Sequence, residues 1–295
     1  MNTVLETSGL TKRYGRTDAL RGCDLLLAGG KVTGLVGPNG AGKTTLLQIA
    51  VGLHRPTAGR IRVLGLDPWR EGVALLSRVG FVAQDRPLHP GFTVAETLEI
   101  GRQLNPRWDH AYALARVKHF GLPLDRPVRS LSTGQRAQVA LTLALGKRPE
   151  VLLLDEPVAN LDPVARLELL EELMGVVAED GPSVILSSNV LADVERVCEH
   201  VVILISGRVR ISGDADELVR SHVLVSGPRR SGRTQPTARS SRSVTPTVKR
   251  RSCFAVMPLR PKTGPRCARR LSRRSSSAIY GRSARRCLND LADPP

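Results

Sequence analysis

The sequence predicts an α/β protein built on a mostly parallel β-sheet. Short apolar runs that resemble buried strands recur along the first 225 residues, as in KVTGLV (31–36), VLLLD (151–155) and SVILSS (183–188). Segments with helical periodicity separate many of them, and this alternation is typical of parallel sheets covered by helices. Between residues 85 and 150 the pattern is helical throughout, which predicts a helical subdomain inserted into the sheet.

The expected elements follow one another in a definite order. Further strands are expected at VLETSGLTKRY (4–14), RIRVLGLDP (60–68), RVGFVAQ (78–84) and VVILISGRVR (201–210). Helices are expected directly after the glycine-rich stretch that begins at residue 37, at 93–104, 110–121 and 134–146, and after the polar turn at 187–189.

The positive charge of the chain is concentrated in its last part, residues 226–295, called the tail below. The tail holds 18 of the 44 Lys+Arg and 2 of the 27 Asp+Glu, so it carries +16 of the net +17. It is rich in Arg, Ser, Pro and Thr without an apolar period, which predicts disorder. Two accounts of it stay open: a basic segment that binds anionic lipid headgroups, or the translation of a shifted reading frame. Residues 1–225, the body, are near neutral and of a size that can bury one core.

Nothing in the body indicates export or membrane insertion. No apolar run approaches the roughly 18–20 residues that a membrane-spanning helix needs, and the first residues lack the apolar core of a signal peptide. Three of the five cysteines lie in the tail, and Cys23 and Cys198 in the body fit a reducing compartment. We therefore expect a cytoplasmic domain.

The stretch GPNGAGKTT, Gly37–Thr45, has the G-x-x-x-x-G-K-[ST] pattern of a P-loop, with an expected strand before it and a helix after it. Backbone N–H groups of such a loop attract phosphates, and Gly37, Gly40 and Gly42 let the chain wrap closely. Lys43 supplies a cation and the Thr44 hydroxyl a ligand for Mg²⁺. A glycine-rich loop with a chance lysine would rarely fit the whole pattern in this context.

Two carboxylates, Asp155 and Glu156, follow the expected strand 151–154 directly. In P-loop proteins an aspartate here holds Mg²⁺, and the next carboxylate can position or deprotonate an attacking water. The alternative is a polar strand end with two solvated acids, which the neighbouring P-loop makes less favoured. The stretch SLSTGQ, residues 130–135, opens a long expected helix. Ser132 and Gly134 at its start form either an anion site or an ordinary N-cap.

Together these motifs resemble the nucleotide-binding subunit of an ABC transporter, over about residues 3–220 and in the family's order. The matching segments are Walker A at Gly37–Thr45, the Q-loop Gln84, the signature LSTGQ at Leu131–Gln135, Walker B at Val151–Asp155 and the D-loop ANLD at Ala159–Asp162. The commonest form of the signature has glycine where Thr133 stands.

The resemblance implies a P-loop NTPase (RecA-like) core with an antiparallel β subdomain and an inserted α-helical subdomain at about 85–150. It implies ATP and Mg²⁺ as cofactors, with Mg²⁺ held by Thr44, Gln84 and Asp155, and catalysis by Glu156 and Gln84 together with position 189. The expected ATP contacts are Tyr14, which would stack on adenine, and Gly37, Pro38, Asn39, Gly40, Ala41, Gly42, Lys43, Thr44, Thr45, Ser132, Gly134 and Gln135.

For partners, the resemblance implies a dimer of ATP-binding subunits, identical or different, with ATP between the P-loop of one and the signature of the other. A separate transmembrane permease would hold the dimer at the inner face of the cell membrane. Within the family, the chain resembles the subgroup whose membrane subunits are separate chains, and that subgroup includes many exporters. A soluble ABC ATPase of the translation or DNA-repair type, with its tail on nucleic acid, is the alternative. The single P-loop and the lack of a long heptad coiled coil disfavour it, so no nucleic acid is expected.

Asn189 departs from the family, which usually has histidine in this turn. An amide can donate a hydrogen bond but cannot carry a positive charge near pH 7. Either hydrolysis is impaired, or the asparagine donor suffices. We favour impaired hydrolysis with ATP binding retained.

Overall fold

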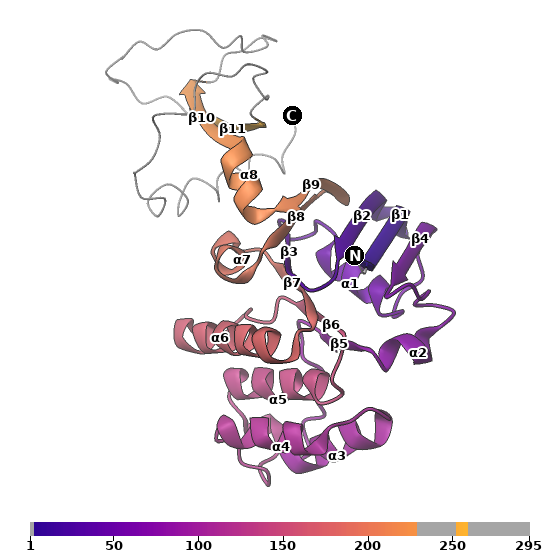
Figure 1. Ribbon diagram of the computed structural model, residues 1–295, viewed down its shortest axis with the longest axis vertical. Helices are drawn as coiled ribbons and strands as arrows, with labels where there is room; N and C mark the ends of the chain where they lie inside the picture. The colour runs from indigo at the N-terminus through magenta and orange to yellow at the C-terminus, as the bar shows by residue number, and fades with distance from the viewer. Residues whose placement is uncertain (1–2, 229–251, 259–295) are drawn as a thin grey trace. The chain divides into compact units, whose positions relative to one another are not determined.

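The computed structural model describes residues 3–228 and 252–258 of the 295-residue chain. It divides into two compact units, Met1–Ala215 and Asp216–Pro295. All of the predicted site residues lie in the first unit, which is shown with its strands and helices in Figure 1.

A six-stranded sheet forms the centre of the first unit, in the order β5-β6-β7-β3-β8-β9. Its strands are β3 (Val32–Val36), β5 (Val79–Val82), β6 (Val151–Asp155), β7 (Ser183–Ser188), β8 (His200–Ile205) and β9 (Arg208–Asp214). All neighbouring pairs are parallel except β8 with β9. Every residue of β3, β6 and β7 is buried, as expected for strands covered on both faces. The predicted parallel sheet is confirmed.

The run at 201–210 was predicted as one strand, and the structure breaks it into the hairpin β8–β9. Ser206 and Gly207 adopt the left-handed conformation, with φ of 49° and 74°. Two consecutive residues of positive φ make a tight turn that matches the twist of a hairpin, so the chain reverses there.

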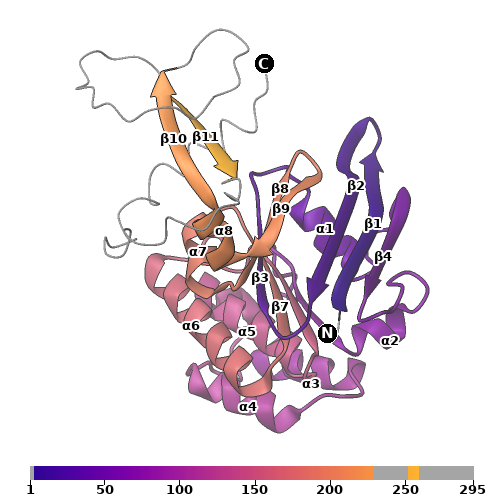
Figure 2. The same cartoon turned by 45° about the horizontal axis from the view of Figure 1, so that its top comes forward.

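A second, antiparallel sheet has the order β2-β1-β4, from β1 (Thr3–Tyr14), β2 (Thr17–Ala28) and β4 (Ala58–Val63). Its position beside the central sheet is visible in Figure 2. Its apolar side chains pack with α1 (Lys43–Ala50) and one face of the central sheet in a single core. The sequence pattern did not predict β2, although Cys23, Leu25 and Leu27 alternate with exposed residues along it.

Helices cover the other face of the central sheet. These are α5 (Thr133–Leu145), α6 (Pro163–Asp180) and α7 (Leu191–Val197), whose apolar side chains share a second core with that face. A short helix, α2 (Gly72–Leu76), precedes β5. Neither α2 nor α6 was predicted. The start of α6 has a clear local cause, because Asp162 accepts hydrogen bonds from the N–H groups of Val164 and Ala165.

The inserted helical subdomain contains α3 (Val94–Leu104), α4 (His110–His119), the 3₁₀ turn η1 (Val128–Ser130) and α5, and the three predicted helices are confirmed. Its own core includes Val94, Leu98, Val117 and Val139. Both α3 and α4 begin at the residues that cap them: Thr93 forms a capping box with Glu96, and Asp109 accepts from the N–H of Tyr112.

The second unit contains α8 (Ala215–Ser221), which starts at the boundary, and strands β10 (His222–Pro228) and β11 (Ser252–Pro258), which pair antiparallel. The boundary expected at residue 225 from the charge stays a prediction. Residues 252–258 form a strand where the sequence predicted no regular structure. Most of the tail lies outside the described residues, and its disorder and its origin stay predictions.

Candidate nucleotide-binding site

A cleft of about 680 Å³ lies where β3, β6 and β7 end, and it collects most of the predicted site residues. The carboxyl ends of neighbouring parallel strands meet at one edge of a sheet, which explains why distant motifs converge there. The lining residues are Tyr14, Thr17, Asp18, Ala19, Asn39 to Thr45, Gln84, Glu156, Val158 to Leu161, Arg166, Ser188, Asn189, Val190 and Asp193.

The P-loop packs so closely that two of its glycines are sterically required. A Cβ at Gly37 would lie 2.2 Å from the carbonyl oxygen of Leu204, and Gly42, with φ of 105°, would meet that of Ala19 at 2.5 Å. Gly42 precedes α1 and provides no side-chain cap. The first N–H groups of a helix have no intrahelical acceptor, so the start of α1 is suited to bind an anion.

Lys43 is buried and reaches the middle of this loop. Its Nζ donates to the carbonyl oxygens of Gly37 (2.9 Å) and Pro38 (3.3 Å). It also lies 3.3 Å from Oε1 of Glu156. An entering phosphate would therefore compete with Glu156 for the ammonium group.

Asp155 is fully buried beneath the P-loop helix. Its Oδ1 accepts from Oγ1 of Thr44 (3.1 Å) and from Oγ of Ser187 (2.7 Å). Ser187 in turn accepts from the backbone N–H of Glu156 at 2.9 Å. The role of Ser187 was not predicted, although Ser187 is the first residue of the polar turn at 187–189. It joins the two acidic residues to β7.

The donor atoms here fit a magnesium ion. Thr44 and Asp155 offer a hydroxyl and a carboxylate oxygen in direct contact, and Gln84 lines the same cleft. Oxygen ligands from one or two protein groups, completed by phosphates and water, are what Mg²⁺ prefers.

Asn189 lines the cleft as expected, and its Nδ2 donates to Oδ1 of Asn39 at 3.2 Å. The turn around it is held by a network that the sequence did not predict. Asp193 accepts from Oγ of Ser188 at 3.2 Å and from both ends of the Arg166 guanidinium. These contacts link the start of α6 with the start of α7.

Tyr14 lies on the rim of the cleft with 42% of its surface exposed. The edge of His54 contacts its ring, with centroids 5.7 Å apart, and Nζ of Lys12 lies 4.9 Å from the ring centroid. An exposed aromatic ring beside a phosphate-binding loop is well placed to stack on a base.

The signature residues do not reach this cleft within one chain. Ser132 caps α5: its Oγ accepts from the N–H of Gln135 at 3.1 Å, while Oε1 of Gln135 accepts from the N–H of Ser132 at 3.0 Å. Neither they nor Gly134 line the cleft. The N-cap alternative is thus what a single subunit shows.

In this parallel sheet the P-loop follows β3, and β6 ends at the buried Asp155, which contacts Thr44 of the P-loop. These features define a P-loop nucleotide-binding protein. Comparison with known proteins narrows this class. The family model described as "ABC transporter" matches residues 20–159. The chain belongs to the ABC transporter family and is an ATP-binding subunit of it.

Two relatives illustrate the similarity. The daunorubicin resistance ATP-binding protein DrrA3 of Streptomyces coeruleorubidus is 38% identical over 222 residues, which cover 74% of this chain and 70% of that one. The Nod factor export ATP-binding protein I of Ralstonia nicotianae is 34% identical over 228 residues, covering 75% and 70%.

Solved structures agree with the fold. The ATP-binding subunit of an ABC transporter superposes with a TM-score of 0.67 at 28% identity, over 74% of this chain and 92% of that one. A bacterial ABC transporter cassette solved as a dimer has a TM-score of 0.62 at 26% identity, over 71% and 98%. Members of this family bind and hydrolyse ATP, and the predicted P-loop core is confirmed.

Proposed function

We propose that this chain hydrolyses ATP to power an exporter through a separate membrane subunit. The observation that carries hydrolysis is that Lys43 and Glu156 line one cleft and form an ion pair there, while the buried Asp155 contacts Thr44 of the P-loop. One relative is named for Nod factor export. The ribose import ATP-binding protein RbsA 2 of Burkholderia cenocepacia is 34% identical, but this chain covers only 47% of it. The name of the Nod factor relative is what supports the exporter type in this proposal.

Each residue in the cleft has a definite task in this proposal. Lys43 exchanges its contact with Glu156 for the γ-phosphate, next to the N–H groups at the start of α1. Glu156, released from the ion pair, orients the attacking water and accepts its proton. Thr44 and Asp155, with Gln84, would hold Mg²⁺, which when bound neutralises charge on the phosphates. Tyr14 stacks on the adenine.

The position of the signature supports a head-to-tail dimer. Because Ser132, Gly134 and Gln135 lie outside their own cleft, we propose that they close over ATP bound by a second subunit. That subunit is either a second copy or a related chain. A dimeric cassette among the similar structures supports the arrangement.

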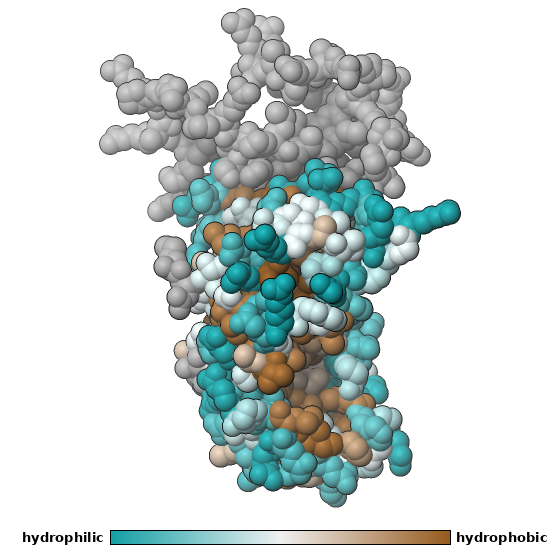
Figure 3. Space-filling view, turned by 90° about the vertical axis from the view of Figure 1, so that its right-hand side faces the viewer, coloured by the Kyte–Doolittle hydropathy of each residue, from teal (hydrophilic) through white to brown (hydrophobic). Residues whose placement is uncertain are grey.

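A separate membrane subunit fits one face of the molecule. No helix among the described residues is long and apolar enough to cross a membrane. Large apolar side chains are exposed on α2, on α3 and on the turn before α2, including Trp69 (54%) of that turn, Val73 (91%) and Leu104 (75%). Figure 3 views the side on which α2 and α3 lie, and hydrophobic side chains surround a hollow in its lower half.

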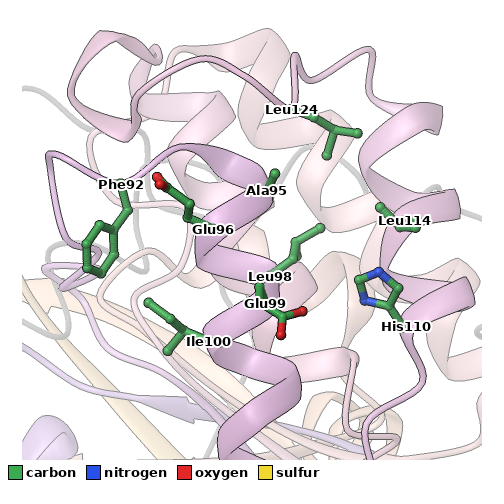
Figure 4. A pocket seen from close by; sticks show the side chains of 9 residues that line it. All are labelled: Phe92, Ala95, Glu96, Leu98, Glu99, Ile100, His110, Leu114 and Leu124. Carbon is green, nitrogen blue, oxygen red and sulfur yellow. The ribbon is translucent and has the colours of Figure 1, made fainter.

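A neighbouring groove of about 560 Å³ lies between α3 and α4. Leu98 of α3 faces His110 and Leu114 of α4 across it (Figure 4). Exposed apolar side chains that gather on one face can mark an interaction site. We propose that the membrane subunit covers this face and holds the chain at the inner side of the membrane.

Glu156→Gln tests the hydrolytic role and the dimer in one experiment. The amide keeps the shape of the side chain but cannot accept the proton, so turnover should fall to near background. Bound ATP should then accumulate and hold two copies together in sizing chromatography with Mg²⁺. The control is Glu168→Gln, which removes an exposed carboxylate of α6 and should leave turnover unchanged.

The two outcomes are separable. Undiminished turnover in Glu156→Gln would contradict the role of Glu156. Lost turnover with a monomer at every ATP concentration would exclude the homodimer and favour a different partner subunit.

A further inference from the structure

Arg86 connects the loop of Gln84 with the turn that follows Glu156. It lies two residues after Gln84, beyond β5, and has a positive φ of 46°. Its Nη2 donates to the carbonyl oxygens of Pro157 (2.5 Å) and Ala159 (3.1 Å). One guanidinium nitrogen thus holds two carbonyls of the segment that carries the proposed catalytic acid.

That segment adopts a conformation that needs support. Glu156 and Asn160 both have positive φ, 45° and 62°, which side chains other than glycine rarely adopt. The two carbonyls held by Arg86 lie between them. Such conformations persist when the surrounding contacts over-determine them, and they gather at functional sites. Arg86 supplies two of these contacts.

The charge of Arg86 makes a purely structural role a poor explanation. Its side chain lies among apolar residues of the sheet, α5 and α6, which are Val82, Ala137, Leu141, Leu154, Leu169 and Leu173. Its Nε is buried without a hydrogen-bond partner, and no carboxylate of the described residues pairs with it. Burial, and to a lesser extent the positive charge of Arg136, lowers the pKa of Arg86. Arg86 is half-buried, and placing a guanidinium among apolar residues, with its Nε unpartnered and no carboxylate beside it in the described part of the chain, is costly, so an apolar side chain would fill this space more cheaply.

We propose that Arg86 is a positioning residue for ATP hydrolysis, because its guanidinium fixes the Glu156 turn to the loop of Gln84. The carboxylate of Glu156 then holds its working position only while the Gln84 loop is in place. This inference rests on the proposed role of Glu156. It adds a residue that does not line the nucleotide cleft.

The test compares Arg86→Met and Arg86→Lys in the full chain with Arg60→Met, which removes the same charge from an exposed position of β4. In Arg86→Met we expect kcat to fall about tenfold, the size of effect that misplacing a catalytic group readily produces, while KM for ATP stays the same. The melting temperature should change little, because Arg86→Met loses two hydrogen bonds to the Glu156 turn but also removes a partly buried guanidinium from apolar surroundings. Arg86→Lys, which retains one cationic donor group, should recover part of kcat.

Amide hydrogen exchange gives a readout that does not depend on turnover. In Arg86→Met, exchange should accelerate at residues 156–161 and remain unchanged in the P-loop. Wild-type kcat in Arg86→Met would overturn the inference, and so would a loss of kcat accompanied by a lower melting temperature and faster exchange throughout. If Arg86→Met does not fold, Arg86→Lys decides: lowered kcat at constant KM supports the inference and wild-type kcat overturns it.

Glu156→Gln is measured in parallel. If Glu156→Gln keeps full turnover, the proposed role of Glu156 fails. If Glu156→Gln is inactive while Arg86→Met is fully active, only the present inference fails.

Discussion

Nδ2 of Asn189 donates a hydrogen bond to Oδ1 of Asn39, 3.2 Å away, and thereby joins the turn after β7 to the P-loop. Both side chains are exposed to the cleft. The bond orients the amide of Asn189 toward the loop that binds phosphate and leaves its second N–H for a further acceptor. A neutral donor therefore occupies the position where the family resemblance led us to expect histidine.

Lys43→Ala should weaken ATP binding. Charge-assisted hydrogen bonds contribute more than neutral ones, so we expect the Kd for ATP with Mg²⁺ to rise about tenfold or more. Calorimetry measures it. The control, Lys31→Ala, removes the same charge from an exposed site beside Asp214 and should leave Kd unchanged. Equal affinity in both variants would refute the P-loop assignment.

Tyr14→Ala separates base stacking from phosphate binding. Stacking of a base on an aromatic ring is worth roughly 1–3 kcal/mol, so affinity for ATP should fall about tenfold. Affinity for inorganic tripolyphosphate should not change, because the ring does not contact the phosphates. Tyr14→Phe keeps the ring and should bind ATP normally. A parallel loss for tripolyphosphate would mean that the variant disturbs the P-loop instead.

The chain truncated after Ser221 should bind ATP with unchanged affinity and melt at the same temperature. The three apolar cores contain residues up to Val209, and every predicted site residue precedes Asp193. The removed residues include β10 and β11, which pair only with each other in the second unit. A large loss of affinity or stability would show that residues 222–295 support the first unit.

Local patterns explain why much of the fold was predictable. Strands such as β6 are buried on both faces and therefore appear as short apolar runs, and the P-loop has a fixed spacing that few other structures produce. The strand β2 was missed because Asp18, Arg21 and Asp24 interrupt the apolar residues of TDALRGCDLLLA. Its last residues, LLLA, are all apolar, so the alternation of buried and exposed positions is not visible in the residue types.

The supporting contacts of the site were not predictable in the same way. Arg86 with Pro157, and Arg166 with Asp193, pair residues that are far apart in the sequence, and no spacing rule connects them. The sequence also cannot tell whether the Ser132 side chain only caps its own helix or also faces a nucleotide cleft, because this depends on what lies next to the helix in space. The structure shows the cap, and in the proposed dimer a second subunit would supply the cleft.

Asn189→His should raise turnover while changing ATP affinity little. The imidazole can carry a positive charge and act on the charge that develops on the transferred phosphate, so its effect belongs in kcat and not in ground-state binding. Because a charge-assisted contact is stronger than a neutral one, we expect a gain of about tenfold, or ~1.4 kcal/mol. The measurement is steady-state phosphate release at saturating ATP, with both proteins in the same oligomeric state.

The matched control for this substitution is Asn39→Ala, which removes the acceptor that orients Asn189 but leaves residue 189 itself unchanged. If the amide of Asn189 already serves as the γ-phosphate donor, Asn39→Ala should lower kcat, and Asn189→His should gain little. If hydrolysis is limited by the missing histidine, Asn39→Ala should change kcat at saturating ATP little, whatever it does to KM as an expected ATP contact, and the gain in kcat should appear only in Asn189→His. Equal rates in wild type and Asn189→His would therefore end the proposal that this site is impaired.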